Sequence, residues 1–185
     1  RGVWVFAEQR DGQFKCVASE LLAKGRQLAD TLKTELSAVC FGYGLKEIEK
    51  LMAQGADKVY VIDAPSLAQP NEDFYTQELA RLIQEHQPEI VLAGATALGR
   101  AFIPRVAASL QTGLAANCTG LEIDAESKIL LQTRPAYGGN LMATVICPEK
   151  RPQMCTIRPH VFKRGRADES RHGQIVRGHF DKASV

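Results

Sequence analysis

The first 112 residues alternate between short apolar runs and segments with helical spacing, and this alternation constrains the fold most. Nearly continuous apolar runs occupy residues 3–8, 35–42, 57–63 and 89–94. Helical patterns occupy residues 20–34, 45–55, 72–86 and 101–110. We expect Ser19 to cap the first helix and Pro104 to lie in the first turn of the fourth. Runs that are apolar throughout are typical of strands covered on both faces. The order therefore predicts an α/β fold, a parallel open sheet with helices on both faces.

The pattern changes after Gly113, where no segment shows a helical period. Strand-like runs separated by short polar turns occupy residues 118–124, 128–135, 140–147 and 153–157. We expect them to add antiparallel strands, as hairpins, at one edge of the sheet. The domain is expected to span residues 1–162. Residues 163–185 are interpreted as a basic linker, because the part up to Lys182 holds six basic residues against three acids.

Composition excludes several classes of function. A chain of 185 residues that is 45% hydrophobic can bury a core without disulfides or metals. The net charge of +2 gives no argument for nucleic-acid binding. The five cysteines show no CxxC spacing, so neither a zinc site nor a disulfide framework is expected. No apolar run is long enough to span a bilayer, and the N-terminal run is too short for a signal peptide. We expect an intracellular, cytoplasmic chain with reduced thiols.

A first candidate binding site is the segment GATALGRAFIPR at residues 94–105. A strand is expected to end at Gly94 and a helix to begin near Arg100. Free backbone amides at such a helix start can bind an anion, and Thr96 and Arg100 are the candidate contacts. The spacing fits neither GxGxxG nor the Walker pattern. The alternative is that Thr96 and Gly99 only shape a tight turn.

A second candidate is the stretch from Thr133 to Pro159, in which Arg-Pro occurs three times. Proline fixes its own φ and keeps the preceding residue extended, so Arg134 is held on a stiff base. Tyr137, Gly138 and Gly139 add an aromatic ring and an open bend beside it. A flavin, a phosphate, an acidic partner surface or a structural ion pair could each engage Arg134. Paired catalytic carboxylates and a Ser-His-Asp order are absent, so we name no catalytic residue.

Three long segments together resemble one known family. They are VWVFAE, ATALGRAFIPRVAASLQTGLAANCTGLEID and LLQTRPAYGGNLMATVICPEKRPQMCTIRP, in this order across residues 1 to 160. They resemble the N-terminal domain of the electron transfer flavoprotein alpha subunit. The resemblance implies a parallel α/β domain of the adenine-nucleotide-binding type with added antiparallel strands. It also implies an electron carrier rather than an enzyme with its own substrate.

The resemblance further implies partners and a cofactor. The alpha subunit of this family pairs with a beta subunit of related fold and carries electrons from flavin dehydrogenases, such as acyl-CoA dehydrogenases, to an acceptor. Its principal FAD lies in a C-terminal domain that has no counterpart before Val185. We therefore expect a fragment that by itself binds little FAD. The block from Thr133 to Asn140 looks most like that of flavin-bifurcating members, in which an arginine, here Arg134, leans toward a second flavin held by the beta subunit.

Two other functions remain open at this stage. A stand-alone adenine-nucleotide-binding domain of the same fold class would bind ATP or AMP at the loop of residues 94–105. A generic interaction scaffold would bind neither flavin nor nucleotide. Nucleotide affinity of the purified chain, without any partner, distinguishes the stand-alone binder from the electron carrier.

Overall fold

The computed structural model describes residues 2–178, and its centre is a seven-stranded sheet. All neighbouring strands of this sheet are parallel. In spatial order they are β12 (Gln174–Arg177), β5 (Lys58–Asp63), β4 (Leu36–Gly42), β1 (Val3–Phe6), β6 (Ile90–Gly94), β11 (Gln153–Ile157) and β7 (Leu114–Cys118). The predicted parallel α/β fold is therefore confirmed.

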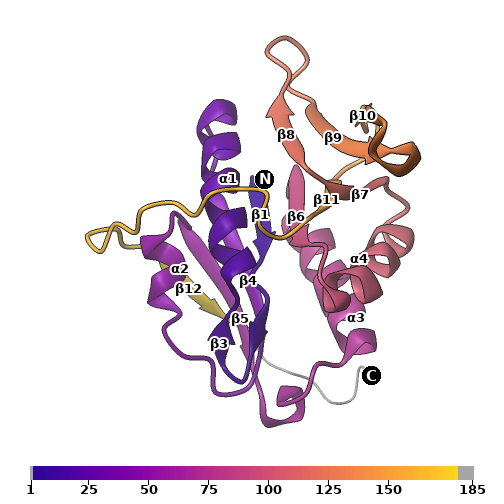
Figure 1. Cartoon of the computed structure of the whole chain (residues 1–185). Helices are drawn as coiled ribbons and strands as arrows, with labels where there is room; N and C mark the ends of the chain where they lie inside the picture. The colour runs from indigo at the N-terminus through magenta and orange to yellow at the C-terminus, as the bar shows by residue number, and fades with distance from the viewer. Residues whose placement is uncertain (1, 179–185) are drawn as a thin grey trace.

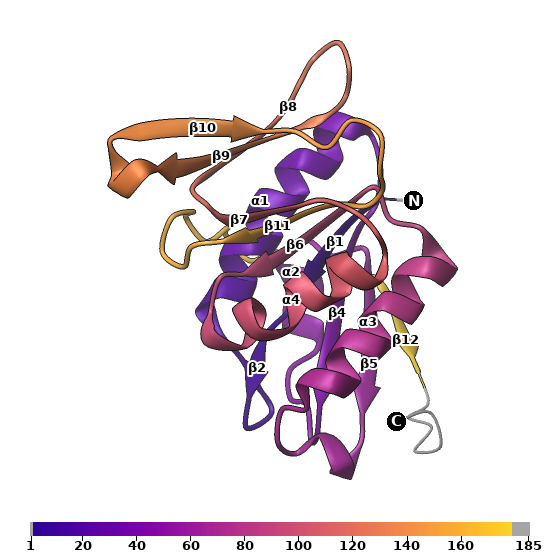
Figure 2. The ribbon, with the colours of Figure 1, turned by 90° about the vertical axis from the view of Figure 1, so that its right-hand side faces the viewer.

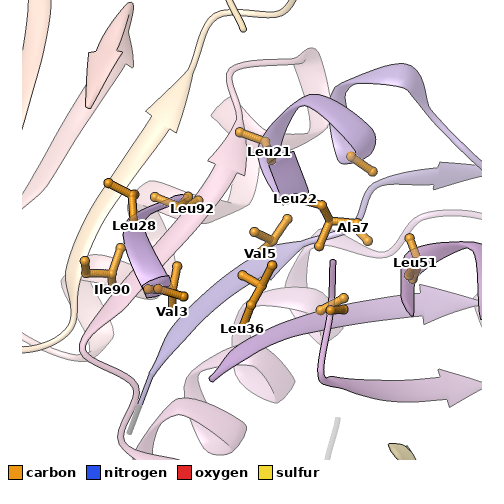
Figure 3. Close-up of a cluster of buried hydrophobic side chains, with 14 of the residues drawn as sticks. Val3, Val5, Ala7, Leu21, Leu22, Leu28, Leu36, Leu51, Ile90 and Leu92 are labelled. Carbon is orange, nitrogen blue, oxygen red and sulfur yellow. The ribbon is translucent and has the colours of Figure 1, made fainter. Parts of the chain in front are cut away.

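Four helices cover the sheet, two on each face (Figure 1). The helices α1 (Cys16–Leu32) and α2 (Glu49–Ala53) pack on one face. The helices α3 (Glu72–His86) and α4 (Ala97–Ser109) pack on the other. Figure 3 shows how α1 places leucines over the strands: Leu21, Leu22 and Leu28 lie against side chains of β1, β4 and β6. The central strands β1, β4 and β6 thus have a buried layer on both faces, which is why their sequences are almost entirely apolar.

Two smaller sheets complete the structure. The strands β2 (Gln9–Arg10) and β3 (Gln13–Phe14) form a short hairpin directly after β1. The strands β8 (Gly120–Ile123), β9 (Leu130–Ala136) and β10 (Leu141–Val145) form an antiparallel sheet beside β7. Figure 2 shows β9 and β10 as a long hairpin that projects from one end of the molecule. The short 3-10 turns are η1 (Pro65–Leu67) and η2 (Tyr137–Gly139), and η2 joins β9 to β10.

The second half of the chain differs from the prediction in one respect. The antiparallel strands exist, but the run at residues 153–157, which was predicted among them, is β11, a parallel member of the main sheet; its neighbour β7 was not predicted as a strand. All five residues of β11 are buried, and the strand lies between β6 and β7. The sequence of β11 gave no sign of this, because the whole antiparallel sheet is inserted into the connection between β7 and β11. Such long-range pairing is not visible in local periodicity.

The expected linker contains a strand. After β11 the chain crosses the outside of α1 and α2 and adds β12 to the far edge of the sheet, parallel to β5 (Figure 1). The crossing segment is fixed by a hydrogen bond from Asp168 N–H to the Ala53 carbonyl (2.8 Å) and an ion pair between Arg171 and Asp57 (2.8 Å). Residues 163–178 therefore pack on the domain, and residues 179–185 of the predicted linker lie outside the described residues.

Three helix starts also differ from the prediction. The helix expected at residues 45–55 is the shorter α2, which begins at Glu49. The first helix begins at Cys16 with Lys15 at its cap position, one turn before Ser19. The fourth helix begins at Ala97, so that Pro104 lies inside it and not in its first turn. Pro104 and Arg100 are both exposed. The Arg100 carbonyl, which loses its helical donor at Pro104, can therefore bind water instead.

Candidate functional site

Arg134 lies near the end of β9, level with the end of β7. Its strand neighbour is Ala143 of β10, and the Thr119 N–H donates to the carbonyl of Thr133 (2.8 Å). Strand alternation puts Arg134 on the same face of β9 as Gln132, which is buried against the domain. Arg134 is partly buried as a residue, and its side chain forms no ion pair or hydrogen bond with any residue between 2 and 178. It therefore carries a positive charge that the described part of the chain does not neutralise.

The charge of Arg134 acts on the buried thiol of Cys118. A hydrogen bond with Cys155 lowers the pKa of the Cys118 thiol, burial opposes this, and the Arg134 charge lowers the pKa further. The Arg134 charge thus acts on a thiol at the carboxyl end of β7. The structural ion pair considered for Arg134 is absent among the described residues.

The turn beyond Arg134 is open and apolar. Gly138 (φ 69°) and Gly139 (φ 94°) adopt left-handed backbone conformations that favour glycine, and a Cβ on either would contact nothing within 4 Å. Tyr137 is 82% exposed, and Leu141 and Met142 are each 59% exposed. Large apolar side chains gathered on one exposed hairpin are unusual for a surface that faces only water.

The other candidate residues surround the start of α4. The Thr96 hydroxyl caps the helix by accepting a hydrogen bond from Gly99 N–H (3.0 Å), and it donates to Glu8 Oε2 (2.5 Å). Gly99 is needed here for space, since a Cβ would lie 1.9 Å from the Gly94 carbonyl oxygen. The Arg100 side chain is exposed to solvent.

The structure does not bring all six candidates together. Arg134, Tyr137, Gly138 and Gly139 share one hairpin, whereas Thr96 and Arg100 follow β6. The strands β11 and β7 lie between β6 and the antiparallel sheet. The candidate residues therefore form two separate sites at the carboxyl edge of the sheet, one on the hairpin of β9 and β10 and one at the start of α4.

The other two Arg-Pro pairs have structural partners. Arg151 forms an ion pair with Glu89 (3.0 Å) and donates hydrogen bonds to three carbonyls of the loop that joins β10 to β11. This loop joins two strands of different sheets, so it is not a hairpin turn. Arg158 donates from its backbone N–H to the Cys118 carbonyl (3.0 Å) and from Nε to Asn117 Oδ1 (3.4 Å).

Sequence reasoning missed two features. Glu8 is 2% exposed and bound by Lys15 and Thr96, yet it looked like the polar end of the first strand. Leu141 and Met142 looked like ordinary strand residues, although both are exposed. A carboxylate placed directly after a buried strand was the available signal for Glu8. For Leu141 and Met142 the lack of strict alternation was the signal, because neighbouring strand residues that are both apolar have no polar face.

Between residues 2 and 178, no group of three or more His, Cys, Asp or Glu side chains is placed to hold a metal ion. No helix in this part of the chain has the length and apolar character that crossing a bilayer requires.

The fold defines a class of protein: a parallel α/β domain with an antiparallel sheet inserted between β7 and β11. The chain belongs to the electron transfer flavoprotein family, since the family model described as "Electron transfer flavoprotein domain" matches residues 3–183.

Relatives of known name support this membership. The electron transfer flavoprotein subunit alpha of Thermoanaerobacterium thermosaccharolyticum is 48% identical over 178 residues, which are 96% of this chain and 54% of that protein. The same subunit of Clostridium acetobutylicum is 50% identical over 165 residues, 89% of this chain and 49% of that protein. Protein FixB of Clostridium saccharobutylicum is 49% identical over 168 residues, 91% of this chain and 50% of that protein. The chain therefore spans about half the length of these relatives.

Proposed function

We propose that this chain is the N-terminal domain of an electron-carrier alpha subunit, which pairs with a beta subunit and carries electrons from flavin dehydrogenases, including the acyl-CoA dehydrogenase type, to an acceptor. Family membership and relatives named as subunits support the proposal. The principal FAD would belong to the half of the relatives that this chain does not match, and a second flavin to the beta subunit. A cytoplasmic location accords with this role.

The observation that carries the proposal is the unneutralised charge of Arg134. A partly buried arginine side chain has lost part of its hydration, and this cost is normally offset by an ion pair or hydrogen bonds. Arg134 has neither among the described residues. A negatively charged group of a cofactor or of a second subunit would offset this cost.

The hairpin around Arg134 fits a flavin held by a second subunit. The backbone of Gly138 and Gly139 is open to close approach, because no atom lies near where their Cβ atoms would be. The exposed apolar side chains of Tyr137, Leu141 and Met142 are typical of the core of a subunit interface. We accordingly assign the beta subunit to this hairpin. Thr96 and Arg100 are not part of this proposal and stay predictions.

A flavin supplies one- and two-electron redox chemistry, and Arg134 would tune it by electrostatics. Reduction places negative charge on the ring, and a fixed guanidinium stabilises that charge. At about 5 Å and an effective dielectric constant of about 20, the interaction is about 3 kcal/mol. This corresponds to a potential on the order of 60 mV higher for a two-electron couple. The proline after Arg134 restricts the backbone, so the charge stays in place.

The test is the flavin midpoint potential in the complex of the whole alpha subunit with its beta subunit. Arg134→Ala is expected to lower the potential of the beta-subunit flavin by tens of millivolts, on the order of the value above, because a stabilising cation is lost. Arg134→Lys should retain part of the effect. Arg81→Ala is the matched control, since Arg81 pairs with Glu78 and Glu85 on the outside of α3. If Arg134→Ala and Arg81→Ala leave the same potential, Arg134 has no role at the flavin.

A further inference from the structure

The crevice between the ends of β1 and β6 is the place where a fold of this kind usually binds its ligand. The chain runs from β1 to β4 and β5 on one side, then returns to β6 on the other, so the strand order reverses between β1 and β6. Open α/β sheets bind ligands beyond the carboxyl ends of their strands at such a point. Here a crevice of about 370 Å³ lies between the segment after β1, the segment before α3 and the first turn of α4.

The buried carboxylate of Glu8 is part of the wall of this crevice. The Glu8 side chain is 3% exposed and forms an ion pair with Lys15 Nζ at hydrogen-bond distance. Its other oxygen accepts the hydrogen bond from the Thr96 hydroxyl (2.5 Å). Thr96 in turn caps α4, so Glu8 is tied to the helix start through one hydroxyl group. The Lys15 backbone N–H also donates to the Glu8 carbonyl (2.9 Å), which closes the loop around the carboxylate.

We propose that Glu8 is an internal anion that closes this crevice to phosphate-bearing ligands. Two side chains of the crevice that could bind a phosphate are already engaged: Glu8 neutralises Lys15, and the Thr96 hydroxyl has one partner as donor and another as acceptor. A phosphate that reached Ala97 and Leu98 at the start of α4 would stand beside a buried negative charge. Two negative charges that lie close together in a partly buried site repel each other strongly. The start of α4 therefore has the geometry of a phosphate-binding helix start, but the charge of Glu8 keeps phosphate from binding there.

The proposal predicts that removing one charge creates a phosphate site. The experiment titrates inorganic phosphate, and separately AMP, into the 185-residue chain while the backbone amide signals of Lys15, Ala97 and Leu98 are followed by NMR. The native chain should show no saturable shift at these amides below about 10 mM ligand, and Glu8→Gln should bind AMP at least about tenfold more tightly than the native chain. Glutamine keeps the size of the side chain and an oxygen for the Thr96 hydroxyl, and Lys15, which is 41% exposed, tolerates the loss of its partner.

Two further variants make the result specific. Glu8→Gln combined with Lys15→Met removes the freed cation and should abolish the gained affinity. Glu122→Gln makes the same charge change at an exposed position on β8 and should behave as the native chain. Saturable binding by the native chain at Ala97 and Leu98 overturns the proposal, and this measurement does not depend on whether any variant folds. A folded Glu8→Gln chain that gains no affinity overturns it as well.

Discussion

Asparagine in place of Asp57 removes a charge from the junction that fastens the segment after β11 to the sheet. The Asp57 carboxylate accepts hydrogen bonds from Leu36 N–H (2.8 Å), Arg26 Nη1 (2.7 Å) and Arg171 Nη2 (2.8 Å). Arg26 belongs to α1 and Arg171 to the segment that crosses it. One side chain thus joins a helix, the start of β4 and the segment that leads to β12.

The magnitude follows from the exposure of the partners. The side chains of Asp57, Arg26 and Arg171 are 31%, 19% and 35% exposed, so solvent screens both ion pairs in part. Pairs of this kind contribute about 0.5 to 1 kcal/mol each. Asparagine still accepts from Leu36 N–H, so only the two charge interactions are lost. We expect the free energy of unfolding to fall by about 1.5 kcal/mol and Tm by about 3 to 6 °C.

The pKa of Asp57 determines how the stability difference between the native chain and Asp57→Asn changes with pH. Burial alone would raise the pKa of Asp57, but the Leu36 N–H and the guanidinium groups of Arg171 and Arg26 outweigh it and hold the pKa below its usual value. A carboxyl group whose pKa is lower in the folded state stabilises that state above the unfolded pKa of about 3.9, and this contribution disappears as the pH falls through the folded pKa. The difference between native chain and Asp57→Asn should therefore be constant from about pH 5 to 7 and shrink below about pH 4.

Urea denaturation at several pH values measures the difference, and Asp30→Asn is the control. Asp30 also pairs with Arg26 (2.7 Å), but it is 66% exposed, and its loss should cost less than about 0.5 kcal/mol. Hydrogen exchange of the β12 amides should accelerate only in Asp57→Asn, because only that variant releases Arg171. Equal costs for the two variants, or a deficit that persists unchanged at pH 3, would refute the reasoning.

Two more predictions concern the two edges of the sheet. Gly99→Ala should destabilise the chain by about 2 kcal/mol or more in urea denaturation, because its Cβ would lie 1.9 Å from the Gly94 carbonyl oxygen and α4 has to shift; a loss below about 0.5 kcal/mol would mean that the turn relaxes freely. The double variant Leu141→Ser and Met142→Ser should change the stability of the chain by less than about 0.5 kcal/mol, since both side chains are exposed. The same variant should weaken binding of the beta subunit at least about tenfold by calorimetry, and unchanged affinity would place the interface elsewhere.

Local pattern was sufficient for the first half of the fold. The helix predicted at residues 72–86 is α3, whose N-terminal N–H groups are capped by Asn71 and whose C-terminal turn ends at His86. The runs after residues 35, 57 and 89 are strands for the reason given in the prediction, that both faces are covered. The strands β1, β4 and β5 are neighbours in the sheet in chain order, and α1 packs on both β1 and β4, so these contacts are short in sequence.

Strand pairings between distant parts of the chain could not be predicted from the sequence. The run at residues 153–157 is a central parallel strand, and residues 174–177 form an edge strand beside β5, more than 110 positions earlier in the chain. Neither pairing leaves a local trace, because a five-residue apolar run reads the same in a hairpin and in a buried parallel strand. The same limit applies to the site. Proline restriction of Arg134 is a local property and was predictable, whereas the role of Glu8 depends on the reversal of strand order between β1 and β6.

The crevice at Glu8 and the hairpin at Arg134 differ in whether their charged groups have partners within the chain. This difference indicates which of the two places binds another molecule. At the crevice, Glu8 is almost fully buried, and both of its oxygens have partners within the chain, so nothing external is needed to stabilise it. At the hairpin, Arg134 has lost part of its hydration without gaining a described partner, and three large apolar side chains nearby are exposed to water. Both features of the hairpin cost free energy in the isolated chain, and binding of an apolar surface that carries a negative group would remove both costs together. Recognition by this domain is therefore expected at the inserted antiparallel sheet and not at the crevice that the parallel sheet provides.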